Sequence, residues 1–225
     1  MPLKGKKALV TGGSRGIGFE ICKILLENEC EVVAVSKTAE TLTLAKSKLP
    51  GLRTLQADVA IASHHELIYG YVSQQWESLD ILINNAGISP KQGNELINQP
   101  DDIFLRTMET NLTGAYLGIK RLFPILLESE DPRIINIGSS MGLISPNLSG
   151  VYSVSKAALH ALTMAFANEL KGQIAVNALC PGWVKTDMAP NAPGNPRSSA
   201  EAVLSLLHRD KSFSGHILAG TSIIE

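Results

Sequence analysis

Short apolar segments alternate with longer amphipathic ones along the chain. The apolar segments, each of which we expect to form a strand, cover residues 8–10, 31–35, 53–56, 81–83, 134–137 and 174–178. Helical spacing of apolar residues appears between the first two strands (Ile17, Ile21, Ile24, Leu25) and between the third and fourth (Leu67, Ile68, Tyr71, Val72, Trp76). This alternation predicts βαβ units, whose right-handed crossovers place helices on both faces of a parallel sheet.

The second half of the chain continues the pattern. Residues 101–127 predict two consecutive helices or one bent helix, with Pro124 kinking or ending the last turns. Residues 151–170 predict a single helix whose inward face consists of Val154, Ala157, Ala158, Ala161, Leu162, Ala165 and Phe166. A proline-rich surface loop over 189–199, a helix over 199–208 and a last strand near 216–218 complete the chain. We therefore expect residues 1–225 to form one doubly wound (Rossmann) α/β domain with a mostly parallel seven-stranded sheet.

Composition narrows the class of protein. Twenty basic and 21 acidic residues leave a net charge of -1, which argues against nucleic acid or a membrane surface as a partner. No apolar run approaches the roughly 20 residues of a membrane helix, and the apolar stretch after the N-terminus is too short for a signal peptide. Cys22, Cys30 and Cys180 lack the paired spacing of a zinc site. We expect a soluble, cytoplasmic protein without a metal.

A glycine-rich turn follows the first strand and opens the first helix. It reads Thr11-Gly12-Gly13-Ser14-Arg15-Gly16-Ile17-Gly18. Glycines at this point allow a pyrophosphate to approach backbone amides at the positive end of a helix. The turn predicts a dinucleotide site.

The residues after the second strand indicate which dinucleotide binds. An NAD site usually has an acidic residue here, against the ribose 2′-hydroxyl. This chain has Ser36 and Lys37 instead, and Arg15 stands in the glycine turn. Hydroxyl and cationic donors suit a 2′-phosphate, so we expect NADP(H). The alternative is that Lys37 is merely a solvated loop lysine.

Tyr152 and Lys156 lie four residues apart near the start of a predicted helix, and hence on one face. A free phenol has a pKa of about 10, and a unit charge ~4 Å away contributes about 4 kcal/mol at an effective dielectric of 20. We therefore expect Lys156 to lower the pKa of Tyr152 and make it a usable proton donor. Thirteen residues before Tyr152, Ser139 ends a strand and can hydrogen-bond a substrate carbonyl. Ser140 is the alternative hydroxyl.

These motifs occur together in a known order. With Asp58, Asn84-Asn85-Ala86-Gly87, Asn111 and Pro181-Gly182, the chain resembles the short-chain dehydrogenase/reductase family over nearly its whole length. The resemblance implies that Tyr152 is the general acid in reduction and that Lys156 lowers its pKa and holds the nicotinamide ribose. It also implies that Ser139 polarises the carbonyl and that Asn111 completes a water-linked proton path. Gly138 departs from the family pattern, which often has a serine there.

The resemblance also implies a cofactor site. Asp58 would meet the adenine amino group, Asn85 to Gly87 would line the adenosine side, and Thr186 would bind the nicotinamide carboxamide. The expected site comprises Gly12, Ser14, Arg15, Gly16, Ile17, Gly18, Ser36, Lys37, Asp58, Val59, Asn85, Ala86, Gly87, Tyr152, Lys156, Pro181, Gly182, Val184 and Thr186. Three alternatives stay open: Asp58 only caps the next helix, Asn111 only braces a helix bend, and Thr186 is only a loop hydroxyl.

The expected activity is the reversible, NADPH-dependent reduction of a small ketone or aldehyde. Residues 180–188 resemble the matching segment of carbonyl reductases, and the short segment over 185–199 suggests an open pocket. The alternatives are a dinucleotide-sensing binding protein and an NAD-linked alcohol dehydrogenase. The resemblance further implies a homodimer or homotetramer that pairs helices 101–127 and 151–170, and the alternative is a monomer, as some reductases of the family are. His64 and His65, adjacent on a predicted helix, are expected to face solvent rather than bind a metal.

Overall fold

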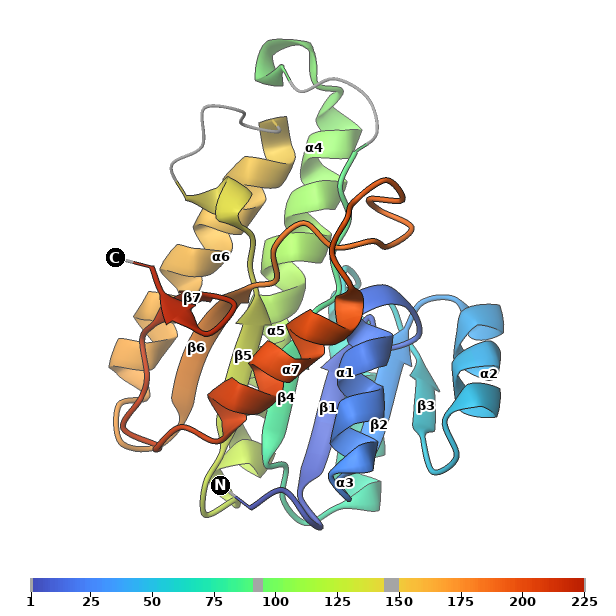
Figure 1. The fold of residues 1–225 in the computed structure, drawn as a ribbon, viewed down its shortest axis with the longest axis vertical. Coiled ribbons are helices and arrows are strands. Elements are labelled where there is room, and N and C mark those ends of the chain that lie inside the picture. Colours follow the sequence, from blue (N-terminus) through green and yellow to red (C-terminus); the bar gives the residue numbers. More distant parts are fainter. Residues whose placement is uncertain (1, 91–94, 144–149, 225) are drawn as a thin grey trace.

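The protein is an eight-stranded sheet between two layers of helices, in a computed structural model that describes residues 2–90, 95–143 and 150–224 (Figure 1). The strand order is β3-β2-β1-β4-β5-β6-β7-β8. The strands are β1 (Lys7–Thr11), β2 (Glu31–Ser36), β3 (Arg53–Gln56), β4 (Ile81–Asn84), β5 (Arg133–Ile137), β6 (Ala175–Cys180), β7 (Ile217–Ala219) and β8 (Ser222–Ile223). The first seven are parallel, as the sequence predicts, and the short β8 adds an antiparallel edge.

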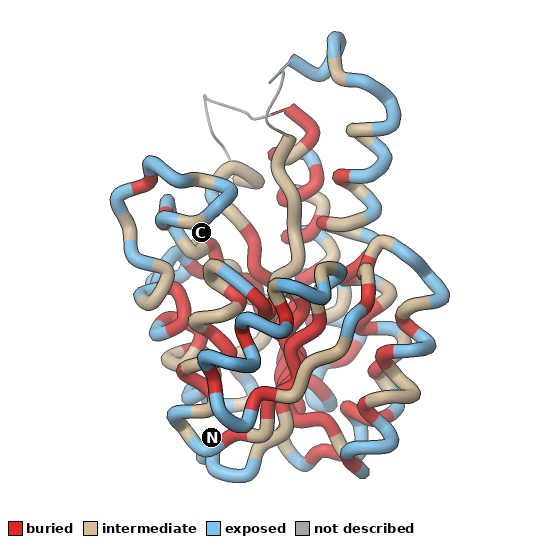
Figure 2. Tube along the Cα trace, turned by 90° about the vertical axis from the view of Figure 1, so that its right-hand side faces the viewer, coloured by how far each residue is buried: buried red, intermediate tan, exposed pale blue. Residues whose placement is uncertain are grey.

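Helices cover both faces of the sheet, so the predicted doubly wound class is confirmed. One face packs against α1 (Gly16–Glu27), α2 (Ala39–Lys48) and α7 (Pro196–Leu207). The other packs against α3 (Ala62–Gln75), α5 (Gly114–Leu127) and α6 (Gly150–Glu169). The central strands are buried on both sides, which explains their nearly continuous apolar character (Figure 2). No helix in the described part of the chain is long and apolar enough to cross a membrane.

The segment from 101 to 127 is one continuous helical run. Helix α4 (Asp101–Met108) passes through a π-helical turn, η2 (Glu109–Thr113), into α5. Pro124 lies inside α5, which continues to Leu127, so the proline does not end it. Helix α7 begins three residues earlier than predicted because the side chain of Asn195 accepts a hydrogen bond from Arg197 N and Pro196 stands at the first helical position.

The inward face predicted for α6 is wrong. Val154, Ala157, Ala161 and Ala165 are exposed, and the buried face carries Val151, Ser153, Ser155, Lys156, Leu159, His160, Thr163 and Ala167. The polar members of this face have partners in the interior. Thr163, for example, accepts a hydrogen bond from Asn136 on β5. Hydrogen bonding to β5 and its neighbours therefore sets the rotation of α6 and leaves its small-residue stripe on the surface.

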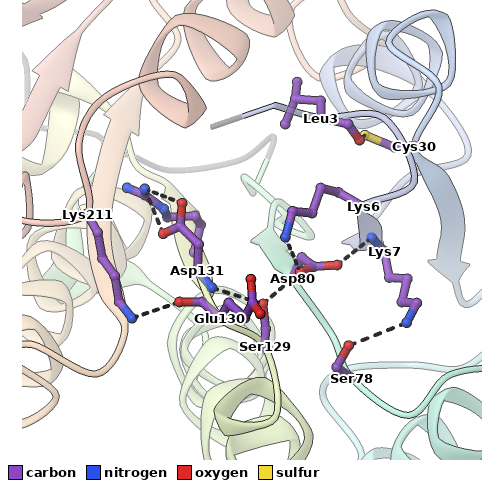
Figure 3. Close-up of polar contacts among 11 residues, drawn as sticks. Leu3, Lys6, Lys7, Cys30, Ser78, Asp80, Ser129, Glu130, Asp131 and Lys211 are labelled. Atoms are coloured by element: carbon purple, nitrogen blue, oxygen red, sulfur yellow. Dashed lines mark hydrogen bonds and ion pairs between the residues drawn. The ribbon is translucent and has the colours of Figure 1, made fainter.

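A polar network ties the amino ends of the strands together (Figure 3). The carboxylate of Asp80 accepts hydrogen bonds from Lys6 Nζ at 2.9 Å, Lys7 N at 2.9 Å and Ser129 Oγ at 2.7 Å. Burial acts to raise the pKa of Asp80, and these hydrogen bonds more than offset it, so the pKa is lowered. The network lies at the amino ends of β1, β4 and β5 and supports these strands. The site described below lies at the carboxyl ends.

Candidate active site

A groove runs along the carboxyl ends of the strands, where β1 lies between β2 and β4 and the strand order reverses. It is lined by Gly12, Ser14, Arg15, Gly16, Ile17, Gly18, Val35, Ser36, Lys37, Thr38, Ala57, Asp58, Val59, Asn85, Ala86, Gly87, Ile88, Thr110, Ile137, Gly138, Tyr152, Lys156, Pro181, Thr186, Asp187 and Met188. All the residues expected to bind cofactor lie here except Gly182 and Val184. Val184 is buried and bridges to Gly194, away from the groove.

The glycine turn forms one wall of the groove. Gly12 and Gly16 have φ values of 65° and 56°, a region that favours glycine. A Cβ on Gly12 would stand 2.8 Å from Nδ2 of Asn85, and one on Gly18 would overlap the Gly12 carbonyl. Asn85 Nδ2 itself donates to Thr11 O at 2.8 Å and to Gly12 O at 3.2 Å. Asn85 therefore braces the turn, and no side chain caps the amides at the start of α1.

A row of hydroxyl groups extends the groove toward α2. Ser14 Oγ donates to Ser36 Oγ at 3.0 Å, and Thr41 Oγ1 lies 2.9 Å from Ser14 Oγ. Thr41 is not among the residues expected from the sequence, although its place in the first turn of the helix after β2 was an available signal. Lys37 lies beside this row and is exposed. Hydroxyl and cationic donors therefore gather where the sequence places a 2′-phosphate.

Two histidines hold the loop after β3. Asp58 N donates to His64 Nδ1 at 2.9 Å, and Nε2 of His65 bonds with Val59 O at 2.9 Å. His65 is buried, so the expectation that both histidines face solvent is wrong. Burial lowers the pKa of His65 and keeps its ring neutral. Asp58 does not cap α3, which begins at Ala62 after Ile61; its Oδ1 accepts from Ala60 N instead.

Tyr152 and Lys156 share one face of α6, as their spacing predicts. Lys156 Nζ lies 5.8 Å from the centroid of the Tyr152 ring and donates to Ile137 O at 2.7 Å. The hydroxyl groups of Ser139 and Tyr152 are hydrogen-bonded to each other. The structure thus brings Ser139, rather than Ser140, to the phenol.

The pKa values differ from the expectation. Burial raises the pKa of Tyr152, and the hydrogen bond with Ser139 offsets only part of the rise. Burial also lowers the pKa of Lys156 to about 8. The predicted depression of the Tyr152 pKa is therefore wrong for this arrangement, because the ammonium group hydrogen-bonds to a carbonyl and lies beside the ring instead of the phenol oxygen.

Asn111 stands behind the groove, in the π-helical turn. Its Oδ1 accepts from Ile88 N at 2.8 Å, and its Nδ2 donates to Ile88 O and to Ser155 Oγ, both at 2.9 Å. The added π turn places this side chain between the loop after β4 and α6, and such turns occur often at functional sites. Asn111 and Lys156 flank Gly87, since a Cβ there would stand 3.4 Å from Asn111 Oδ1 and 3.7 Å from Lys156 Nζ.

The segment after β6 closes the other side of the groove. A Cβ on Gly16 would stand 3.2 Å from Cγ2 of Thr186, so Thr186 lies against the glycine turn. Arg15 forms an ion pair of 2.7 Å with Asp187, and both side chains are exposed. Met188 lines the groove. Trp183, five residues earlier in the chain, is 68% exposed.

Comparison with known proteins identifies similar sequences and structures. The model of the short chain dehydrogenase family matches residues 6–196. A 3-oxoacyl-(acyl-carrier-protein) reductase of Vibrio harveyi is 32% identical and covers 95% of this chain and 94% of its own. A short chain dehydrogenase structure from Pseudomonas syringae has a TM-score of 0.90 at 27% identity, covering 97% of this chain and 96% of its own. The RhlG/NADP active-site complex of Pseudomonas aeruginosa has a TM-score of 0.86 at 32% identity, covering 97% of both chains.

Proposed function

Because the chain belongs to the short-chain dehydrogenase/reductase family, we propose that this oxidoreductase uses NADPH to reduce a ketone or aldehyde, with Tyr152 as proton donor. The observation that carries the proposal is the placement of Tyr152 and Lys156 on one wall of the groove, with the Ser139 hydroxyl bonded to the phenol. A phenol, a hydroxyl and an ammonium group are the parts that carbonyl reduction needs from a protein.

The groove fits a dinucleotide. The glycine turn leaves backbone amides at the start of α1 open to a pyrophosphate, and glycine is required there by both φ and space. Ser14, Ser36, Lys37 and Arg15 supply donors for a 2′-phosphate, while Asp58 and Val59 line the adenine end. The NADP in the RhlG complex supports the same cofactor for this chain.

The residues of the chain act on the substrate carbonyl. The hydride that reduces the carbonyl carbon would come from NADPH when it is bound. Ser139 donates a hydrogen bond to the carbonyl oxygen, and Tyr152 transfers its proton to that oxygen as the alcohol forms. Lys156 holds the ribose hydroxyls and stabilises the tyrosinate left behind. Tyr152 enters the reaction protonated, since its raised pKa keeps the phenol intact at neutral pH.

The substrate carries its carbonyl on an apolar group. Met188 lines the groove, and Trp183, which follows β6 and is largely exposed, lies five residues before it and outside the groove lining. The named relative from Vibrio harveyi is a 3-oxoacyl reductase rather than a carbonyl reductase. This favours a 3-oxoacyl thioester over the simple ketone or aldehyde expected from the resemblance of residues 180–188 to carbonyl reductases. Both kinds of substrate belong in the test.

A spectrophotometric assay tests the proposal. NADPH and NADH oxidation are followed with a 3-oxoacyl thioester, simple ketones, aldehydes and quinones. We expect turnover with NADPH, and a loss of at least about a hundredfold in kcat for Tyr152→Phe, because general acid catalysis contributes 10²–10⁴-fold. Tyr71→Phe, on α3 and outside the groove, is the matched control and keeps full activity. NADPH binding without turnover on any substrate indicates a dinucleotide sensor, and a preference for NADH with alcohols indicates an NAD-linked dehydrogenase.

We also propose that two copies pair through α5 and α6. The stripe of Val154, Ala157, Ala161 and Ala165 faces outward on α6, and Tyr116 is exposed on α5. Small apolar side chains allow the backbones of two helices to pack closely, and a contiguous exposed apolar face marks an interaction surface. The test is the oligomeric state of the protein in solution.

A further inference from the structure

His160 extends the stripe formed by Tyr152 and Lys156, because it lies one further helical turn along α6. The three side chains contact the end of β5 and the two residues after it. Lys156 bonds to Ile137 O, the His160 ring lies against Gly138, and the Tyr152 phenol bonds to the Ser139 hydroxyl. Lys156, Tyr152 and Ser139 all take part in the proposed reaction. His160 has no part in its chemical steps.

We propose that His160 is a positioning residue that holds Ser139 in place for the proposed reduction. Ser139 N donates to Nε2 of His160 at 3.4 Å, so this nitrogen carries no proton. The ring proton is therefore on Nδ1, which is directed toward the backbone of Gly142 in the short helix η3 (Ser140–Gly142) but, in the described structure, is buried without a hydrogen-bond partner. His160 thus holds the start of the turn that carries the Ser139 hydroxyl through its hydrogen bond with the Ser139 amide. The inference rests on the proposed function, since Ser139 matters only where a carbonyl is polarised.

Gly138 provides an independent observation. A Cβ at this position would overlap Nε2 of His160, so no residue other than glycine fits while the ring is there. This explains the glycine at a position where the resemblance leads us to expect a serine. The histidine and the glycine therefore form a matched pair, with the ring taking the room that a side chain at position 138 would need.

The ring is also held neutral. His160 is 4% exposed, and burial together with the nearby Lys156 lowers its pKa to about 4. Cys180 lies beside the same nitrogen, with Sγ 3.7 Å from Nε2, and burial raises the pKa of its thiol to about 11. Neither group carries charge near pH 7. His160 can therefore accept the Ser139 amide hydrogen without adding a positive charge next to Lys156.

Two substitutions separate the hydrogen bond from the packing of the ring. His160→Leu fills similar space without an acceptor, whereas His160→Gln places an amide oxygen near the position of Nε2. We expect His160→Leu to lower kcat at least tenfold, with the Kd for NADPH within twofold of wild type, and His160→Gln to keep kcat within threefold of wild type. The proposal is overturned if His160→Leu retains more than half of kcat, or if both variants lose kcat equally.

A second readout does not require turnover. In protein labelled with ¹⁵N-serine, the Ser139 amide signal is identified by its loss in Ser139→Ala, and its hydrogen exchange is then measured. We expect slow exchange in wild type and His160→Gln, and at least tenfold faster exchange in His160→Leu. Equal exchange in all three overturns the positioning role even in a protein with full reductase activity. Faster exchange in His160→Leu alone supports the role even where no carbonyl substrate is turned over, so the two proposals fail separately.

The pair can also be tested by exchange of volume. Gly138→Ser alone forces its side chain against the His160 ring, and we expect kcat to fall at least tenfold. Adding His160→Ala vacates that space, so the double variant should recover at least fivefold over Gly138→Ser alone. A double variant no more active than Gly138→Ser contradicts the matched pair.

Discussion

Arg15 and Asp187 form an ion pair of 2.7 Å across 172 positions of the chain. The pair joins the glycine turn to the segment after β6, which lies beyond the amino end of α1 in Figure 1. Arg15 is also a proposed ligand of the 2′-phosphate. Asp187 and the cofactor therefore compete for the same guanidinium group.

Removing the carboxylate should favour NADPH. Exposed ion pairs are worth about 0.2–1 kcal/mol, so Asp187→Asn should tighten NADPH binding by up to about fivefold and leave NADH binding unchanged. Fluorescence titration of both cofactors measures the effect. Asp187→Glu keeps the charge and should bind as wild type does. Equal tightening for NADH would show that Asp187 acts on the segment as a whole and not through Arg15.

The hydroxyl row should set the preference between the two cofactors. Ser36→Asp places a carboxylate beside Ser14 and Lys37, where it repels a 2′-phosphate and accepts from a 2′-hydroxyl. Hydrogen bonds to charged groups contribute about 1.5–3 kcal/mol, so the KM for NADPH should rise at least about tenfold while that for NADH falls. Ser36→Ala is the control, with a smaller loss and no gain for NADH. An unchanged KM ratio in Ser36→Asp would place the phosphate elsewhere.

The pKa of Lys156, about 8, predicts the alkaline limb of the pH profile. Above that pH the amine is neutral and cannot stabilise a tyrosinate, so kcat/KM for reduction should fall as the pH rises through about 8. Tyr152 does not cause this limb, because its raised pKa keeps the phenol protonated there. Lys156→Arg stays charged to far higher pH and should lose the limb, at a lower plateau rate. A limb at the same pH in Lys156→Arg would assign it to another group.

Local sequence patterns predicted the strands and those parts of the site that are short contiguous motifs. Apolar runs between helical segments located all seven parallel strands, because strands buried on both faces are apolar throughout. The glycine turn, Ser36 with Lys37, and the Tyr152 and Lys156 spacing are contiguous motifs with direct geometric meaning. The structure accordingly brings all of them to one groove.

The same patterns could not predict the side-chain hydrogen bonds formed in the folded protein. The alanine stripe of α6 has the periodicity of a core face, yet it is exposed because Asn136 and Ile137 on β5 bond to Thr163 and Lys156. His65 is polar but buried, because Val59 O accepts its ring proton. Thr41 belongs to the site only through Ser14, 27 positions earlier. Each miss depends on a polar contact that the periodicity of apolar residues does not reveal.

The buried carboxylate of Asp80 should contribute to stability in a pH-dependent way. Its folded pKa is below the ordinary 3.8, so its contribution is fully present above 3.8 and is lost as the pH falls through the folded value. Asp80→Asn should lower the free energy of unfolding by about 1–3 kcal/mol at pH 7, with a smaller difference below pH 3.8. Urea unfolding at the two pH values measures this. Glu29→Gln breaks the exposed pair with Lys4 and should change little.

Pairing through α6 should be abolished by a charge on its exposed stripe. Ala161 lies in the middle of this stripe, so Ala161→Glu in a dimer would bring two carboxylates into an apolar contact, where an unpaired charge is costly.

We expect sedimentation velocity to show a dimer or tetramer for wild type and a smaller species for Ala161→Glu, with an unchanged far-ultraviolet circular dichroism spectrum. Leu44→Glu, on the exposed surface of α2 across the sheet, adds the same charge and should leave the assembly intact. A monomeric wild type, or an Ala161→Glu variant that keeps the wild-type assembly, would contradict pairing through this face. Loss of assembly without loss of NADPH turnover would further show that each subunit forms its groove alone, as expected from a site whose proposed residues all come from one chain.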